Sequence, residues 1–228
     1  MSSVPNSNQS VSLQDSPNSV SLEAVAGDLT KRELKRRLWH MLPGMTPFIL
    51  WAFPHEDPIS PTLKAIILTY AMIVGGRIFL QFRSISRDKN DSAAGSVLGY
   101  VFSVVGTLLL FPAHAEVGFL VLGILAFGDG SATFGGLYFR SRKLPWNSDK
   151  SLAGMISFLT MGTFMGTAIY WGEANPSVNL LTALSIAAPT AFCAAIAESL
   201  PVKLNDNFRV GITAAIVAPL AHYLIVGM

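Results

Sequence analysis

Long runs of apolar residues, separated by short polar segments, make up most of the chain beyond residue 37. Seven such blocks can be marked, at about residues 38–53, 62–80, 94–111, 117–127, 152–171, 178–197 and 210–226. A helix needs roughly 17–25 apolar residues to cross a bilayer, and most of the blocks come near this length. The pattern therefore predicts an all-α membrane protein, built as a bundle of about seven transmembrane helices in the lipid bilayer.

The amino-terminal stretch differs from these blocks in composition. Residues 1–30 are rich in Ser, Asn and Pro and contain few large apolar side chains. They lack a basic start followed by an apolar run, so a disordered cytoplasmic tail is predicted, not a signal peptide. Residues 31–228 are predicted to form a single transmembrane helical domain. Charged residues make up only 13% of the chain, against roughly 25% in soluble domains.

The basic residues predict the orientation of the bundle. With a cytoplasmic amino terminus, all of the 16 lysines and arginines except Lys64 fall on the cytoplasmic side or at the inner end of a block. This bias follows the positive-inside rule and favours an odd number of spans. The chain is thus predicted to be an integral, multi-pass membrane protein. The net charge of +2 gives no reason to expect nucleic acid as a partner.

The richest polar segment is Gly128-Asp129-Gly130, at the predicted end of the fourth block. Glycines beside an aspartate let the backbone approach a ligand, and free backbone N–H groups can hold phosphate. The Asp129 carboxylate could bind Mg²⁺ carried by a nucleotide. No Gly-Lys-Ser/Thr follows, so the segment is not a Walker A loop. A plain helix terminus with a solvated aspartate is the open alternative.

Two further polar clusters follow on the same predicted side. Lys143 and Lys150 could neutralise phosphate charge, and Ser151 is placed to cap the fifth block and aim its amino terminus at an anion. An ordinary positive-inside loop would also explain the lysines.

The third cluster begins with Glu198, at the end of the sixth block, and continues with Asp206 and Asn207 before the seventh block. Such residues suit a metal or a sugar hydroxyl, although they are also ordinary turn and cap residues.

A basic stretch opens the folded part of the chain, and His40 stands one helical turn from Arg36 and Arg37. His40 could accept a proton or contact a headgroup, and an interfacial anchor is the alternative. The remaining histidines and the single cysteine do not cluster with it in the sequence: His55, His114, His222 and Cys193. A zinc site is therefore not expected.

Taken together, these clusters resemble the polyprenol kinases, which include phytol, farnesol, dolichol and CTP-dependent diacylglycerol kinases and are relatives of the phosphatidate cytidylyltransferases. The matching residues are Glu33-Leu-Lys-Arg-Arg-Leu-Trp-His40, Gly128-Asp-Gly130 with Ala132 and Gly135-Gly136, Lys143, Lys150-Ser151 with Gly154, Glu198-Ser-Leu-Pro, and Asp206-Asn207. The combination is fairly specific and spans the chain from about residue 31 to its end. The family's Arg-Lys pair is Arg36-Arg37 here, which keeps the charge but changes the geometry.

The resemblance implies transfer of the γ-phosphoryl group of a nucleoside triphosphate, expected to be CTP, to a hydroxyl at the cytoplasmic face. The acceptor would be an isoprenoid alcohol such as phytol, farnesol or dolichol, or diacylglycerol. Mg²⁺ is the implied cofactor, with Asp129 and Glu198 as metal ligands. The implied roles are catalysis by Asp129, Glu198 and Asp206; nucleotide binding by Gly128, Gly130, Lys143, Lys150 and Ser151; and substrate or headgroup contact by Arg36, Arg37, His40 and Asn207.

Two other functions stay open at this point. A cytidylyltransferase would make a CDP-lipid, although the chain lacks the long signature of those enzymes, with its Lys-Asp and terminal Asp-Arg pairs. A membrane transporter would place its site near the bilayer midplane, where the predicted helix centres carry no charge. The sequence leaves the oligomeric state open.

Overall fold

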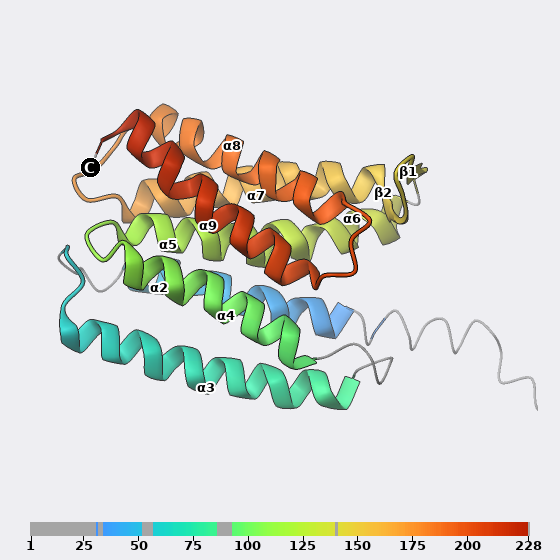
Figure 1. The fold of residues 1–228 in the computed structure, drawn as a ribbon, viewed down its shortest axis with the longest axis horizontal. Helices are drawn as coiled ribbons and strands as arrows, with labels where there is room; N and C mark the ends of the chain where they lie inside the picture. Colours follow the sequence, from blue (N-terminus) through green and yellow to red (C-terminus); the bar gives the residue numbers. More distant parts are fainter. Residues whose placement is uncertain (1–30, 32–33, 52–56, 86–92, 140, 228) are drawn as a thin grey trace, which may run out of the picture.

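The computed structural model describes residues 31, 34–51, 57–85, 93–139 and 141–227, and these form a bundle of helices (Figure 1). The prediction of an all-α membrane protein is confirmed for this part of the chain, apart from one small hairpin. The predicted tail, residues 1–30, lies outside the described residues.

Residues 34–41 are helical and lead into a 3₁₀ turn. The elements that follow are η1 (Leu42–Met45), α2 (Thr46–Leu50), α3 (Pro61–Ile85), α4 (Ala93–Leu110), α5 (Ala115–Gly123), the π-helical turn η2 (Ile124–Asp129), α6 (Gly130–Phe139), β1 (Lys143–Leu144), β2 (Asn147–Ser151), α7 (Leu152–Glu173), α8 (Leu180–Ser199) and α9 (Asp206–Ile225). Most boundaries lie within a few residues of the predicted blocks, because apolar run length decides where such helices begin and end.

Five helices in the described part of the chain are long and apolar enough to cross a membrane. They lie in α3, α7, α8 and α9 and in the continuous helix Ala115–Phe139, and the shorter apolar helix Gly95–Leu110 lies within α4. In the first predicted block the helix tightens at Leu42, and prolines stand in the first turns of both η1 and α2. The count of seven spans and the cytoplasmic amino terminus stay predictions.

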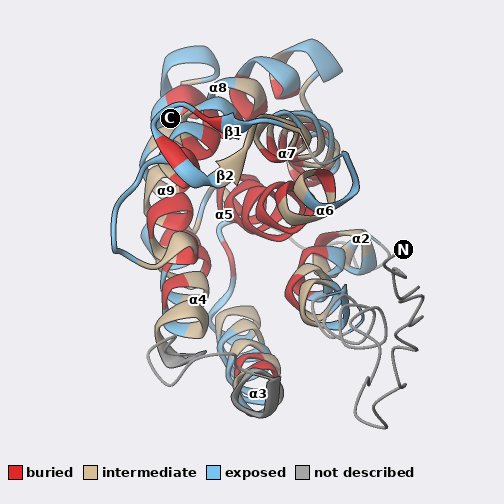
Figure 2. Cartoon of the chain, turned by 90° about the vertical axis from the view of Figure 1, so that its right-hand side faces the viewer, coloured by how far each residue is buried: buried red, intermediate tan, exposed pale blue. Residues whose placement is uncertain are grey.

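The centre of the bundle is a single rod formed by α5, η2 and α6, and Figure 2 shows its buried residues surrounded by the other helices. The expectation that a helix ends at Gly128-Asp129-Gly130 is therefore wrong, because the chain stays helical through this segment. The glycines have a packing role instead. A Cβ at Gly128 would come within 2.9 Å of the Phe158 ring, and one at Gly130 within 2.5 Å of Met41.

The segment before α7 was expected to be a loop, and it forms a short antiparallel hairpin of β1 and β2. The end of this hairpin is also the start of α7, where the Ser151 hydroxyl accepts a hydrogen bond from the Gly154 amide at 3.1 Å. The predicted capping by Ser151 is confirmed.

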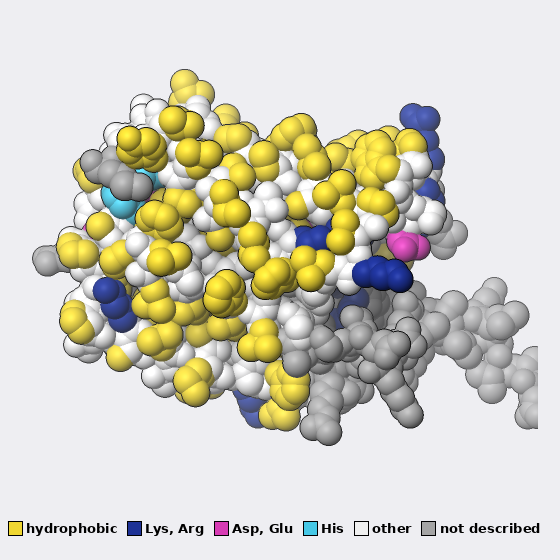
Figure 3. All heavy atoms as spheres, viewed as in Figure 1, with side chains coloured by type: hydrophobic (Ala, Val, Ile, Leu, Met, Phe, Trp, Pro, Cys, Tyr) yellow, Lys and Arg dark blue, Asp and Glu magenta, His cyan; other side chains and the backbone are white. Residues whose placement is uncertain are grey.

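Large apolar side chains cover the outer surface of the bundle, and Figure 3 shows them spread over most of the visible face. On this face the Asp and Glu colour is clearest at the end where the hairpin lies, and Lys and Arg side chains occur there as well as at the opposite end and the lower edge (Figure 3). The histidine colour appears at the end away from the hairpin, near the carboxyl terminus (Figure 3). A surface with an apolar middle and polar ends suits a helix bundle placed in a bilayer.

Candidate active site

The buried carboxylate of Asp129 marks one polar centre, at the last residue of η2. Its Oδ2 lies 2.9 Å from Nη1 of Arg37 and 3.2 Å from Nε2 of His40, both on the amino-terminal helix. Asp129 is 3% exposed and His40 is 5% exposed. A buried carboxylate requires such partners, because an unpaired charge in the protein interior is costly.

The partners of His40 indicate which of its ring nitrogens carries the proton. Nε2 lies 3.0 Å from the carbonyl oxygen of Leu125 in η2, and a carbonyl can only accept. Nε2 is therefore assigned as the N–H donor toward Leu125 and Asp129. In the neutral ring this leaves Nδ1 as the nitrogen that can accept a proton.

A second polar centre joins the hairpin to α8 and α9. The Nζ of Lys150 contacts Oε1 of Glu198 and lies 2.7 Å from Oδ2 of Asp206. Asp206 also pairs with Arg209, whose Nη1 donates to the Leu200 carbonyl at 2.6 Å. Burial alone would lower the pKa of Lys150, but the Glu198 and Asp206 carboxylates outweigh it and raise that pKa above its ordinary value. Lys150 is thus held charged between two carboxylates.

The hairpin is anchored to the end of α8, and this fixes the position of Lys150. Asn147 Nδ2 donates to the Ser199 carbonyl at 3.0 Å, and Trp146 Nε1 donates to the Ser199 hydroxyl at 3.2 Å. Because Lys150 lies on β2, these contacts hold its ammonium beside Glu198 at the end of α8.

A polar cavity of about 320 Å³ lies at this end of the bundle. It is lined by Arg36, Arg37, His40, Ser96, Asp129, Val202, Lys203, Leu204, Asn205, Asp206 and Asn207. Cationic and acidic side chains from the amino-terminal helix, the central rod and the start of α9 thus face one space. Cations in a confined cavity attract anions such as phosphate.

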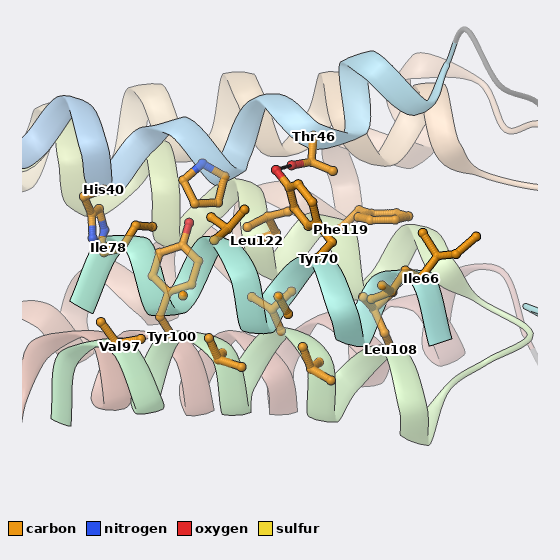
Figure 4. Close-up of a pocket in the computed structure, with 18 of the residues that line it drawn as sticks. His40, Thr46, Ile66, Tyr70, Ile78, Val97, Tyr100, Leu108, Phe119 and Leu122 are labelled. Carbon is orange, nitrogen blue, oxygen red and sulfur yellow. Dashed lines mark hydrogen bonds between the residues drawn. The ribbon is translucent and has the colours of Figure 1, made fainter. Parts of the chain in front are cut away.

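An apolar groove of about 360 Å³ adjoins the polar cavity, and Figure 4 shows side chains that line the groove. The groove lies between α2, α3, α4 and the central rod, and His40, Ser96 and Asn207 line both spaces. Tyr100 stands edge-on to the His40 ring at this junction, with ring centroids 5.1 Å apart. The two spaces together can accept a molecule with a long apolar tail and a polar head.

The structure brings most of the predicted site residues together. Those that line the polar cavity are Arg36, Arg37, His40, Asp129, Asp206 and Asn207. Lys150 and Glu198 adjoin them through Asp206, and the charges of Lys150 and Asp129 act on each other. Lys143 lies apart on the exposed hairpin, where its Nζ reaches the Asp149 carbonyl at 3.4 Å. The roles assigned to these residues, and the nucleotide contacts of Gly128, Gly130 and Ser151, stay predictions.

Several residues of the cavity and its surroundings were not predicted as site residues. Ser96 accepts a hydrogen bond from Asn205 at 2.8 Å, and its carbonyl accepts one from Asn207 at 3.1 Å. Lys203 also lines the cavity, and Arg209 holds Asp206. The only signal for Arg209 was its spacing of three residues from Asp206, which places the two on one helix face. Nothing local marks Ser96 in an apolar block.

The carboxylates of Glu198, Asp206 and Asp129 differ in how readily they could bind a divalent cation. Glu198 and Asp206 share one ammonium, so their oxygens already flank a position held by a positive charge. Carboxylate oxygens are the ligands that Mg²⁺ prefers. Asp129, predicted to share a metal with Glu198, instead directs Oδ2 at Arg37 and His40. The donor set at Lys150 therefore fits Mg²⁺ more directly than the predicted pair does.

Comparison with known proteins gives relatives along most of the chain. Phytol kinase 1, chloroplastic, of Arabidopsis thaliana is 27% identical over 214 residues, which cover 85% of this chain and 69% of that protein. Farnesol kinase, chloroplastic, of the same plant is 28% identical over 212 residues, covering 83% of this chain and 67% of that protein. A probable phytol kinase 1 of Glycine max is 26% identical over 209 residues, covering 86% and 69%.

No family model and no solved structure matches the chain. The relatives nevertheless confirm the resemblance that the motifs carry. Over more than four fifths of its length, the chain is similar to proteins named phytol kinase and farnesol kinase.

Proposed function

We propose that the protein is a lipid-alcohol kinase, which transfers the γ-phosphoryl group of a nucleoside triphosphate to the hydroxyl of an isoprenoid alcohol. One observation carries the proposal: an apolar groove and a charged cavity meet at His40, Ser96 and Asn207. A long-chain alcohol has an apolar tail and one hydroxyl, and this junction is where that hydroxyl would stand. The names of the relatives, phytol kinase and farnesol kinase, support the same class of acceptor.

The acceptor hydroxyl needs a group that receives its proton, and His40 is our candidate for this general base. The hydrogen bonds of Nε2 leave Nδ1 as the accepting nitrogen, and Asp129 stabilises the imidazolium that forms. A carboxylate that orients a histidine in this way is a recurrent device in catalysis. Glu198 and Asp206 are then left to bind Lys150 and cations on the nucleotide side.

The donor phosphates would occupy the polar cavity, where Arg36, Arg37 and Lys203 provide positive charge. Phosphoryl transfer depends mainly on positioning and charge neutralisation, so a cationic cavity is the expected setting. Glu198 and Asp206 would hold Mg²⁺ when it enters with the nucleotide, and the bound ion would neutralise phosphate charge. Lys150 would move from this position toward the phosphates. CTP stays the donor that the family resemblance implies.

The test is a kinase assay of the full-length protein, purified in detergent, with phytol, farnesol, a dolichol and diacylglycerol and with each nucleoside triphosphate. We expect a phosphorylated isoprenoid alcohol and release of a nucleoside diphosphate. With labelled CTP, release of pyrophosphate and a CDP-lipid would identify a cytidylyltransferase instead. Absence of product from every alcohol, in protein that remains folded by circular dichroism and monodisperse by gel filtration, would refute the proposal.

A further inference from the structure

A separate cluster of polar side chains, buried at Glu116 and His222 and partly exposed at His114, lies at the end of the bundle opposite the polar cavity. His114 precedes α5, Glu116 lies in the first turn of α5, and His222 lies in the last turn of α9. Their ligand atoms all lie within 4.8 Å of one another. Glu116 and Asp129 are 13 positions apart on the central rod, which corresponds to about 20 Å. The cluster is therefore separate from the proposed kinase site.

The carboxylate of Glu116 is buried without a full set of partners. Glu116 is 2% exposed, and its Oε2 has no hydrogen-bond partner. Its Oε1 lies 3.2 Å from Nδ1 of His114 and 3.6 Å from Nδ1 of His222. Among the residues that the structure describes, the ion-pair partners of Glu116 are these two histidines. A buried carboxylate that lacks a lysine or arginine is costly unless it takes up a proton or a cation joins it.

The separations of the Glu116 oxygen from the two histidine nitrogens match those in a metal site. Zn²⁺ binds His nitrogen at about 2.0–2.1 Å and carboxylate oxygen at about 2.0–2.2 Å, so a tetrahedral site separates its ligand atoms by roughly 3.3–3.5 Å. Oε1 of Glu116 lies 3.2 and 3.6 Å from the two Nδ1 atoms, which brackets this range, and all three ligand atoms lie within 4.8 Å of one another. Two imidazoles and a carboxylate favour zinc over Mg²⁺ or Ca²⁺, which prefer oxygen ligands alone.

We propose that His114, Glu116 and His222 form a Zn²⁺-binding site that ties the start of α5 to the end of α9. The fourth position would hold water, within reach of the Tyr170 hydroxyl, which now hydrogen-bonds His222 Nδ1 at 2.6 Å. On metal binding, Tyr170 would exchange this bond for one to the water. Because Tyr170 belongs to α7, the site would join three helices of the bundle. The proposal is independent of the kinase function.

The experiment uses the full-length protein in detergent, stripped of metal with a chelator and dialysed. Zn²⁺ is then titrated in competition with a chromophoric chelator, and the melting temperature is measured with and without Zn²⁺. We expect one Zn²⁺ per chain with micromolar or tighter affinity, and a higher melting temperature with Zn²⁺. Mg²⁺ at the same concentration should not displace it. No binding in the micromolar range would overturn the proposal.

Matched variants locate the ion. Glu116→Gln keeps the side-chain volume but removes the charge, and it should weaken Zn²⁺ binding at least a hundredfold. His114→Asn should weaken it similarly, and because the His114 side chain is 25% exposed, that variant should fold even if Glu116→Gln does not. Asp149→Asn, an exposed carboxylate on the hairpin, is the control and should bind like the parent. Equal binding by the parent and His114→Asn would show that the metal lies elsewhere and would overturn the site.

Discussion

Asp129 and Glu116 are buried carboxylates on the same central rod, and the structure stabilises them differently. Asp129 meets a guanidinium from Arg37 as well as the His40 ring. Glu116 meets the rings of His114 and His222, and in the described part of the chain it makes no ion pair with lysine or arginine. Both residues are nearly inaccessible, at 3% and 2% exposure.

The difference indicates which ligand each end of the rod can accept. At Asp129 the negative charge is already balanced, and the surrounding cavity presents further cations, so the site is suited to a polyanion such as a nucleotide. At Glu116 the charge is met by groups that are also metal ligands, so the site is suited to a cation. The predictions below test this contrast, beginning with the largest expected effect.

Asp129→Asn should lower kcat about a thousandfold, because it removes both the partner of Arg37 and the group that stabilises a protonated His40. Asp129 is buried within a helix, so the substitution should also lower the stability of the protein. The same substitution at a solvent-exposed carboxylate would not be expected to do so. The measurement is initial rate in detergent together with a thermal melt. Asp149→Asn is the matched exposed control. Parental activity in a folded Asp129→Asn protein would remove Asp129 from the mechanism.

His40→Gln should lower kcat about a hundredfold, the usual range for loss of a general base. The parent's rate should fall at acid pH as the base becomes protonated, and the variant should lack that limb of the profile. The pH dependence of kcat therefore separates a base from a residue that only positions the alcohol. An acid limb that persists unchanged in His40→Gln would assign the titrating group to another residue.

Lys150→Ala should raise the KM for the nucleotide about tenfold and leave the KM for the lipid alcohol nearly unchanged. In the proposed function the Lys150 ammonium, which bridges Glu198 and Asp206 in the structure, moves to the phosphates, and a charge-assisted contact there would contribute about 1.5–3 kcal/mol. Kinetics with each substrate varied separately would show the split. An equal rise in both constants would point to general distortion of the hairpin anchor.

Ala71→Phe should raise the KM for the lipid alcohol about fivefold, because Ala71 lines the apolar groove and a ring there reduces its volume. The nucleotide KM should not change. Ile73→Phe is the control, since Ile73 lies on the same helix, is 62% exposed and does not line the groove. If both variants behave alike, the groove does not bind the alcohol.

Helix positions were predictable from the sequence because each depends on a local run of apolar residues, and the Ser151 cap was predictable because capping is local too. The helical conformation of the segment around Asp129 was not predictable in this way. Glycine next to a polar residue is typical of a turn, but here Gly128 and Gly130 allow Phe158 and Met41 to pack against a continuous helix. Tertiary packing thus outweighs local preference at these positions.

The candidate active site and the His114–Glu116–His222 cluster differ in how far the sequence could predict them. The motifs predicted that Asp129, Lys150 and Asp206 share one end of the bundle, because each stands at a block end on one side of the membrane. The contact between His114 and His222 joins residues more than a hundred positions apart. Spacing along the chain carries no information about such a pair, and the fold alone brings it to Glu116.

In the proposed kinase, the groove would also determine how deep the alcohol lies in the bilayer. On α4 its lining extends from Ser96 to Leu108, about 18 Å along the helix, slightly more than one leaflet of a hydrocarbon core roughly 30 Å thick. Lining residues such as Ile49 and Ile66 are also exposed on the outer surface, at 60% and 58%. In a bilayer, an alcohol could therefore enter the groove laterally from its own leaflet, and the end of a longer tail would remain among the lipids. The protein would therefore fix the depth of the hydroxyl in the membrane but would accept tails of different lengths.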